Sequence, residues 1–253
     1  MKKPFIIEDG YPFIAVPFFL AVLAAYFVNF YVAVVPLVLS AYFMYFFRNP
    51  HRTIPSDETL LVSPADGTVV SVEPAHEDLY LGQDCCKIVI FLSIFDAHVN
   101  RTPLSGVIKF QQYTCGRFRP AYKDGVGYEN ERYALGIDNG RTRLLITLVA
   151  GVLARRVVSW VTLGDVLEHG QLYGMIKFGS CIEIYVQDNV EISVKKGDRV
   201  RGGESIIGRI VKEIHKSLLI YFRKFMLRCS QYDLILTGEF YVGRFMYFLC
   251  HAL

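Results

Sequence analysis

The residues best suited to chemistry in this sequence stand beside apolar segments that are predicted to be strands. Asp66 lies in the turn-like stretch Ser63–Gly67, directly before one such segment. His98 follows the most apolar of these segments, and Ser180 opens an alternating one. Carboxylate, imidazole and hydroxyl groups are those that proteins use for proton transfer and nucleophilic attack. Each residue also has an ordinary explanation when taken alone, because Asp-Gly pairs form turns and single histidines are often structural.

Other local patterns in the sequence do not indicate a catalytic or metal-binding site. Ser180 does not lie in the G-x-S-x-G turn of hydrolases, and the charged run Glu129–Arg132 by itself predicts a solvated turn. The six cysteines include no C-x-x-C pair, and no histidine stands at metal-ligand spacing. We therefore expect no metal, and mostly buried thiols of the kind found in the reducing cytoplasm.

The composition narrows the classes of protein to consider. Hydrophobic residues make up 53% of the 253 residues and charged residues 20%, which excludes a disordered or low-complexity chain. The net charge is only +3, and no zinc-finger, RNP or helix-turn-helix pattern is present. This balance favours contact with an anionic membrane surface over nucleic acid, so no nucleic-acid partner is expected.

Most of the apolar excess lies near the N-terminus, where Tyr11–Phe47 contains no charged residue. A single helix of that length would run roughly 56 Å, nearly twice the hydrocarbon thickness of a bilayer. Two shorter spans fit better, and we place them at Pro12–Val28 and Phe30–Phe47 with Asn29 at the turn. The sequence thus predicts an N-terminal membrane helical hairpin within residues 1–48.

Two alternatives to a membrane hairpin are a cleaved signal peptide and a hairpin buried in a core. A signal peptide has a shorter apolar region, and cleavage would leave a second apolar segment behind. Basic residues flank both ends of the apolar stretch, which favours a cytoplasmic position for both ends. We therefore expect the cell membrane as the location, with residues 49–210 on the cytoplasmic side.

The middle of the chain predicts a mainly β (α+β) domain. Five short apolar runs are separated by glycine-containing segments: Thr68–Val72, Lys87–Phe95, Leu144–Ala150, Val157–Thr162 and Ile182–Val186. Trp160–Ile176 and Val194–Ile210 form a weak repeat, each with a Gly-Asp pair typical of tight turns. Such turns occur in the sandwiched β-barrels of lipoyl and biotin carriers. Neither repeat has the lysine those carriers modify, so the pattern predicts a barrel scaffold only.

The tail at residues 211–253 differs from the rest in being basic and rich in aromatic residues. Val211–Arg228 fits a basic amphipathic helix on a membrane and equally a helix packed on the domain. No role is assigned to this tail.

Taken together, six blocks in order resemble one family. They are Phe46–Pro50 (FFRNP), Ser63–Gly67 (SPADG), Phe91–Pro103 (FLSIFDAHVNRTP), Glu129–Arg132 (ENER), Ala150–Arg156 (AGVLARR) and Phe178–Ser180 (FGS). Their order and context closely resemble the short branch of phosphatidylserine decarboxylase proenzymes. The resemblance runs from about residue 5 to about residue 210.

The resemblance implies a chain that makes its own cofactor. Members of the family cut themselves at a Gly-Ser bond, and the serine becomes a covalent pyruvoyl group. The matching bond here joins Gly179 and Ser180, which would give a β chain of residues 1–179 and an α chain of residues 180–253. His98 would take the proton of the Ser180 hydroxyl, and Asp66 would orient the imidazole, as in serine-protease logic.

The resemblance also implies the reaction that follows. The pyruvoyl carbonyl would form a Schiff base with phosphatidylserine, accept electrons as CO2 leaves, and release phosphatidylethanolamine, with His98 as proton donor. Arg101 stands where longer members carry a second histidine. It would bind the lipid phosphate or carboxylate, or form a structural ion pair. The expected partners are the membrane, a phospholipid and the chain's own second half as a heterodimer, with a higher oligomer left open.

Three alternatives stay open from the sequence. A relative of the same class would act on a serine lipid with other tails. A membrane-anchored binding module would keep the Gly179–Ser180 bond intact. A degenerate member would fail to mature.

Overall fold

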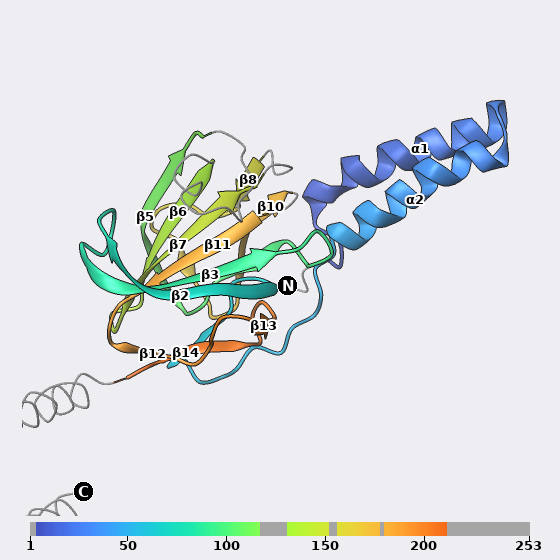
Figure 1. Cartoon of the computed structure of the whole chain (residues 1–253). Helices are drawn as coiled ribbons and strands as arrows, with labels where there is room; N and C mark the ends of the chain where they lie inside the picture. Colours follow the sequence, from blue (N-terminus) through green and yellow to red (C-terminus); the bar gives the residue numbers. More distant parts are fainter. Residues whose placement is uncertain (1–3, 117–130, 152–155, 178–179, 212–253) are drawn as a thin grey trace, which may run out of the picture. The chain divides into compact units, whose positions relative to one another are not determined.

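The computed structural model describes residues 4–116, 131–151, 156–177 and 180–211 (Figure 1). The chain divides into two compact units, Met1–Val211 and Lys212–Leu253, and the described residues belong to the first. The predicted helix Val211–Arg228 lies outside the described residues from 212 onward.

The first unit is mainly β, with two apolar helices at its N-terminus. In chain order its elements are η1 (Glu8–Gly10), α1 (Tyr11–Phe27), α2 (Phe30–Phe46), β1 (Leu60–Val62), β2 (Gly67–Glu77), β3 (Gln83–Leu92), β4 (Val99–Arg101), β5 (Gly106–Thr114), β6 (Arg132–Asp138), β7 (Arg143–Ala150), β8 (Arg156–Ser159), β9 (Val166–Leu167), β10 (Leu172–Lys177), β11 (Ser180–Val186), β12 (Val190–Ile192), β13 (Arg199–Val200) and β14 (Ile206–Ile210).

The helices begin and end within one residue of the predicted spans. Asn29 separates them, because its side chain accepts a hydrogen bond from Val32 N at 2.9 Å and so caps the start of α2. The helices pack along each other, and Ser40 Oγ donates to Ile14 O at 2.9 Å. Figure 1 shows them projecting together from one end of the β structure.

Both helices keep most of their apolar side chains exposed. The helical segment Glu8–Phe27 is long and apolar enough to cross a membrane, with only 17% of its most apolar window buried. Phe30–Phe46 is a shorter apolar helix of 17 residues. Exposed apolar surface of this extent marks a site of contact with lipid or another apolar partner.

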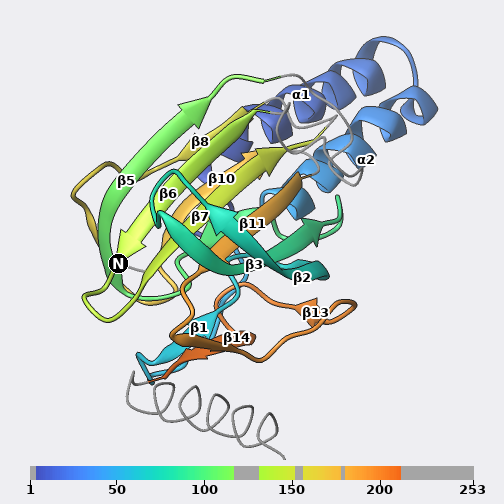
Figure 2. The ribbon, with the colours of Figure 1, turned by 60° about the vertical axis from the view of Figure 1, so that its left-hand side comes forward.

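Eight strands form one curled antiparallel sheet in the order β13-β2-β3-β11-β7-β6-β5-β9 (Figure 2). Its central strand β11 pairs with β3 on one side and β7 on the other. Two three-stranded sheets, β4-β10-β8 and β1-β14-β12, complete the domain. The main hydrophobic core contains Ile182 of the large sheet, Tyr173 of the first small sheet and Leu61 of the second.

The weak sequence repeat corresponds to two similar strand arrangements. β1 pairs with β14 and β2 with β13, while β4 pairs with β10 and β5 with β9. The turn glycines Gly164 and Gly197 have φ of +93° and +97°, a conformation that favours glycine. The aspartates that follow these glycines, Asp165 and Asp198, accept hydrogen bonds from the backbone N–H groups three residues earlier, at 2.8 and 2.9 Å.

Two predicted strands end earlier than expected. The run Lys87–Phe95 leaves the sheet at Leu92, because Asp96 accepts from Ser93 N at 2.8 Å and closes a turn. The run Val157–Thr162 ends at Ser159, whose hydroxyl donates to Val161 O at 3.1 Å. Both turns use side-chain hydrogen bonds to the backbone, which compete with sheet pairing.

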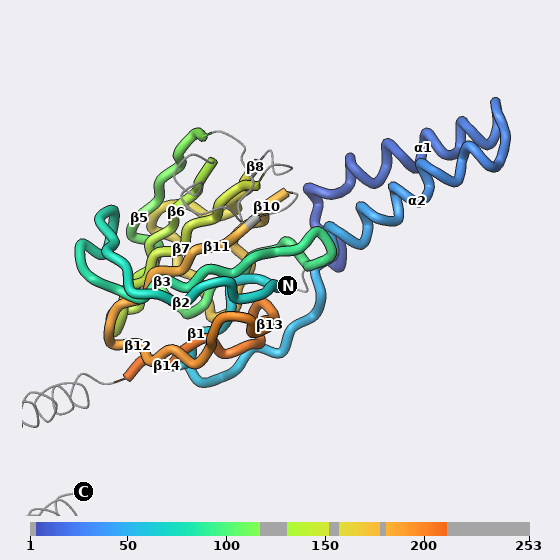
Figure 3. The backbone as a smooth tube through the Cα atoms, viewed as in Figure 1, coloured from blue at the N-terminus to red at the C-terminus, as the bar shows by residue number. Residues whose placement is uncertain are grey.

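A second apolar cluster joins the helices to the β domain. Phe46 and Phe47, at the end of α2, are fully buried and pack with Val99 of β4 and Met175 of β10. The helices are therefore seated on the small sheet that leads to Ser180 (Figure 3).

Candidate active site

Ser180 is the first residue of β11, in the centre of the large sheet. Its backbone is in register with Leu92 of β3 and Ala150 of β7. Three residues before it, β10 ends at Lys177 in the neighbouring small sheet. The bond predicted to be cut thus lies in the connection between two sheets, and Gly179 itself lies outside the described residues.

His98 is bonded to β10, the strand that precedes this connection. Its backbone oxygen accepts from Ile176 N of β10 at 3.3 Å, four residues before Ser180. The imidazole is fully buried and stacks on Phe46, with ring centroids 4.1 Å apart. Nδ1 lies 2.9 Å from Asp96 O, which assigns the proton of the neutral ring to Nδ1. Nε2 is buried and has no hydrogen-bond partner among the residues that the structure describes, so its lone pair is free toward them.

The surroundings of His98 keep the imidazole neutral. Burial lowers its pKa to about 4, and the nearby Arg48 charge acts in the same direction. The bond to the Asp96 carbonyl and the charge of Asp66 oppose this shift. At neutral pH the ring is therefore a proton acceptor in a dry environment.

This shift predicts a pH-dependent stability. An unfolded histidine takes up a proton near pH 6.5, whereas buried His98 does so only near pH 4. Neutral His98 therefore makes its full contribution to the free energy of unfolding above about pH 6.5. As the pH falls toward 4, about 3 kcal/mol of that free energy is lost. Thermal unfolding of Ser180→Ala against Ser180→Ala/His98→Gln between pH 7 and pH 4 should show a steeper loss for the chain that keeps His98. Parallel curves would contradict the neutral buried imidazole.

Asp66 is placed close to this region but is not bonded to His98. Its carboxylate accepts from Arg52 at 2.8 and 2.6 Å and from Gly202 N at 2.8 Å. Its charge still raises the pKa of His98. The structure therefore pairs Asp66 with a guanidinium, and the expected contact with the imidazole is not among its hydrogen bonds.

Arg101 is largely buried and contacts neutral acceptors. Its guanidinium donates to Asn49 Oδ1 at 2.7 Å, and to Pro50 O and Gly170 O at 3.2 Å each. Within the described part of the chain no carboxylate lies within ion-pair distance of it. Burial and the nearby Arg52 charge lower its pKa. It lines a cavity of about 500 Å³ together with Arg52 and His169.

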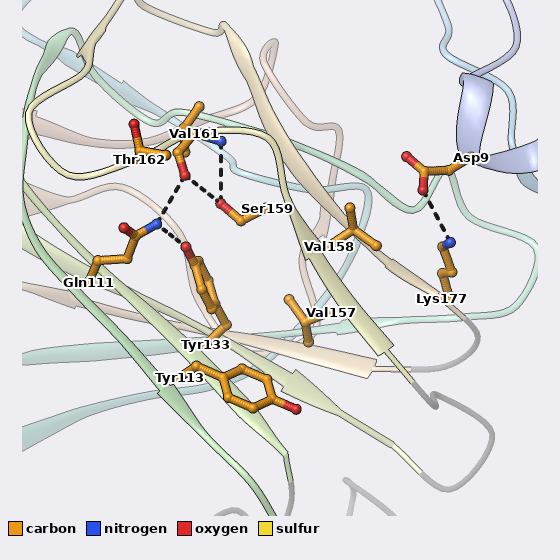
Figure 4. A pocket seen from close by; sticks show the side chains of 10 residues that line it. All are labelled: Asp9, Gln111, Tyr113, Tyr133, Val157, Val158, Ser159, Val161, Thr162 and Lys177. Carbon is orange, nitrogen blue, oxygen red and sulfur yellow. Dashed lines mark hydrogen bonds and ion pairs between the residues drawn. The ribbon is translucent and has the colours of Figure 1, made fainter.

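A second cavity, of about 660 Å³, lies beside the end of β10 (Figure 4). Lys177 on its wall bonds Asp9 at the start of the helices, at 3.2 Å. Asp9 also accepts from Trp160 Nε1 at 3.1 Å. Tyr133 and Gln111 bond each other on the opposite wall, as Figure 4 shows. Sequence analysis missed this cavity, because its residues come from distant segments.

Two further residues, Glu131 and Asn100, lie in blocks that resemble the family but were given no role from the sequence. Glu131 is buried and accepts from Val157 N at 3.3 Å, so at this residue the predicted solvated turn is wrong. Asn100, two residues after His98, is fully buried, and neither of its amide atoms bonds a residue within the described ranges.

Comparison with known proteins identifies a family. A model of the family described as phosphatidylserine decarboxylase matches residues 39–208. The chain is 46% identical over 212 residues to a protein of Carboxydothermus hydrogenoformans, covering 83% of this chain and 99% of that one. It is 43% identical over 211 residues to one of Symbiobacterium thermophilum, covering 83% and 98%. A protein of Anaplasma phagocytophilum is 40% identical over 215 residues, covering 84% and 94%. All three are named phosphatidylserine decarboxylase proenzyme, and the chain belongs to the phosphatidylserine decarboxylase family.

Proposed function

We propose that this chain cuts itself between Gly179 and Ser180 and then decarboxylates phosphatidylserine to phosphatidylethanolamine and CO2. One observation carries the proposal. His98 is a buried, neutral imidazole with a free ring nitrogen, held against β10 four residues before Ser180. A free base of this kind beside a Gly-Ser bond is what serine activation needs.

Self-cleavage follows from these groups. Ser180 Oγ attacks the Gly179 carbonyl carbon while its proton passes to His98 Nε2. The carbon–nitrogen bond breaks, the Ser180 nitrogen takes the proton, and an ester replaces the amide. A base then takes the Cα proton of residue 180 and the Cβ–Oγ bond breaks, which releases residues 1–179 with a free carboxylate and leaves dehydroalanine. Water then replaces the nitrogen, ammonia departs, and a pyruvoyl group remains at residue 180.

The residues present suit that group. Residue 180 is a serine at the start of a central strand, and His98, whose backbone bonds Ile176, has an Nε2 that is unpartnered among the described residues and can carry a proton. Once formed, the pyruvoyl group supplies an electron-withdrawing carbonyl that accepts electrons as CO2 leaves. We propose that His98 returns a proton to the substrate carbon. Stacking on Phe46 excludes water from this side of the ring.

Asp66 is proposed to act through its charge. It raises the pKa of His98 and thereby favours the protonated ring that forms during each proton transfer. The two Arg52 bonds hold the carboxylate in one position while it does so.

The two products are proposed to stay together as a heterodimer. After the cut, β11 of the α chain would still lie between β3 and β7 of the β chain. β13 and β14 would also remain paired with β2 and β1. Breaking these ladders would expose the hydrophobic core.

We further propose that the domain is the predicted sandwiched barrel, on a membrane hairpin made by α1 and α2. The two equivalent strand arrangements support the barrel, and the exposed apolar helices support the anchor. Arg48 and Arg52 follow the helices directly, which favours a cytoplasmic catalytic domain at the cell membrane.

Arg101 is proposed to bind an anionic group of the lipid. Toward the described residues it uses three of its five N–H donors, all on neutral acceptors, which leaves two donors for a ligand in the adjoining cavity. Arg101→Gln should raise the KM for phosphatidylserine about tenfold or more, and Arg101→Lys should recover part of the loss. Arg209→Gln, at an exposed arginine, is the matched control. An unchanged KM with a lower melting temperature would assign Arg101 a structural role.

The activity is tested with phosphatidylserine labelled at the serine carboxyl, in vesicles containing the full chain. The expected result is labelled CO2 and an equal amount of phosphatidylethanolamine. A serine lipid with ether-linked tails in a parallel assay tests the alternative substrate. A cut chain that releases no CO2 from either lipid would contradict the proposed reaction.

A further inference from the structure

The loop between β3 and β4 presents two apolar side chains to solvent. Ile94 is 37% exposed and Phe95 is 62% exposed, and both directly follow strand β3. Exposing a phenylalanine of this kind costs free energy unless something apolar covers it.

The loop is held in one shape. Asp96 N donates to Ser93 O, and Ser93 N donates to the Asp96 carboxylate, both at 2.8 Å. The other carboxylate oxygen of Asp96 pairs with Arg199. The exposed side chains therefore stand on a tight turn that is fixed at both ends, and the turn cannot fold them inward without breaking these bonds.

The same loop is fastened to the last turns of α2. Tyr42 Oη donates to Ile94 O at 3.4 Å, and Arg48 Nη2 donates to Phe95 O at 3.0 Å. Figure 3 shows the chain after β3 reaching the lower end of α2. Ile94 and Phe95, the exposed tip of the loop, thus lie beside the C-terminal end of α2. Their apolar surface adjoins the apolar surface of that helix.

The residues around this tip are those that favour a membrane interface. Arg48 lies over the Tyr45 ring at 3.7 Å and carries its charge at the end of the helix. On the α1 side, the partly exposed Trp160 bonds Asp9 through its indole nitrogen. Tyrosine, tryptophan and arginine at helix ends are typical of the boundary between lipid and water.

We propose that Ile94 and Phe95 enter the lipid bilayer beside α2 and hold His98 at the depth of the lipid headgroups. The inference rests on the proposed membrane hairpin and deepens it. Two side chains bury far less area than a protein partner needs, whereas a bilayer requires no matching surface. His98 follows this tip by three residues, and its Nδ1 bonds the carbonyl of Asp96 within the loop. The residues that contact the membrane and the proposed base His98 therefore belong to one rigid segment. This arrangement suits a substrate that stays in the bilayer.

Fluorescence quenching by brominated lipids tests this placement. The chain has one tryptophan, Trp160, so Trp160→Phe gives a background into which single tryptophans are placed. The full chain carrying Phe95→Trp is reconstituted in vesicles of phosphatidylcholine and phosphatidylglycerol with brominated acyl chains. Leu79→Trp, at an exposed leucine in the connection between β2 and β3, is the negative control. Leu37→Trp, in the middle of α2, is the positive control.

The expected result is strong quenching at position 37, strong quenching at position 95 by bromines near the headgroup, and none at position 79. Quenching at 37 without quenching at 95 would overturn this inference and leave the membrane hairpin intact. Absence of quenching at 37 would instead overturn the hairpin, and the inference with it.

An activity measurement separates membrane contact from a structural role of Phe95. Phe95→Ser should lower turnover of long-chain phosphatidylserine in vesicles about tenfold. It should leave turnover of dispersed short-chain phosphatidylserine unchanged, because a monomeric lipid needs no membrane depth. An equal loss on both substrates would show that Phe95 acts by stabilising the loop, and would contradict the proposal.

Discussion

Replacing Ser180 with alanine is expected to leave one uncut chain of 253 residues with no decarboxylase activity. The methyl group has no oxygen to attack the Gly179 carbonyl, so neither the ester nor the pyruvoyl group can form. Alanine fits a strand position, so the sheet around β11 should remain intact. The measurement is gel separation of the purified chain together with CO2 release from phosphatidylserine.

Ser71→Ala, on β2, is the matched control and should be cut and active like the unmodified chain. Decarboxylase activity in Ser180→Ala would contradict the pyruvoyl mechanism. Cutting of Ser180→Ala at the same bond would show that another residue, or a contaminating protease, breaks it.

Replacing His98 with glutamine is expected to slow self-cleavage by about 10²–10⁴-fold. Glutamine is polar and of similar size but does not accept and return a proton. The rate of self-cleavage is measured as the fraction of uncut chain at set times after the chain is synthesised. His76→Gln is the control. His76 is an exposed histidine that bonds Asp84, and it is far in sequence from the cut site.

The His98 result separates two roles. An uncut His98→Gln chain supports the imidazole as the base of self-cleavage. A fully cut but inactive chain would assign His98 to proton donation in decarboxylation alone. A fully cut and active chain would show that neither role belongs to His98.

The helices were predictable because their signal is local. An apolar stretch free of charge and a capping asparagine between two spans determine where α1 and α2 begin and end. The predicted ends of two strands were wrong where Asp96 and Ser159 close turns with their side chains. Those residues also occur within strands, so their types alone did not indicate the turn.

The duplicated strand arrangement was only half visible in the sequence. The Gly-Asp turns indicated the second pair of strands in each copy, β9–β10 and β13–β14. The first pair in each copy, β1–β2 and β4–β5, is marked by Ser63-Pro64 and Thr102-Pro103. Ser63 Oγ donates to Ala65 O at 2.7 Å, and Thr102 Oγ1 donates to Leu104 O at 2.5 Å. The shared pattern of a hydroxyl residue, proline and a later glycine is the signal that would have revealed it.

The environment of the candidate site depends on contacts between distant segments. Phe46 stacks on His98 across 52 positions of sequence, and Gly202 bonds Asp66 across 136. The low pKa of His98 follows from burial, which the sequence does not encode locally. The family resemblance indicated which residues to examine, and the structure adds that Asp66 is paired with Arg52 instead of the imidazole.

Intact mass spectrometry of the purified full-length chain tests the central claim most directly. The account predicts two masses, one for residues 1–179 and one for residues 180–253 with a pyruvoyl group in place of the N-terminal serine. A single mass for the whole chain of 253 residues would contradict self-cleavage at Gly179–Ser180.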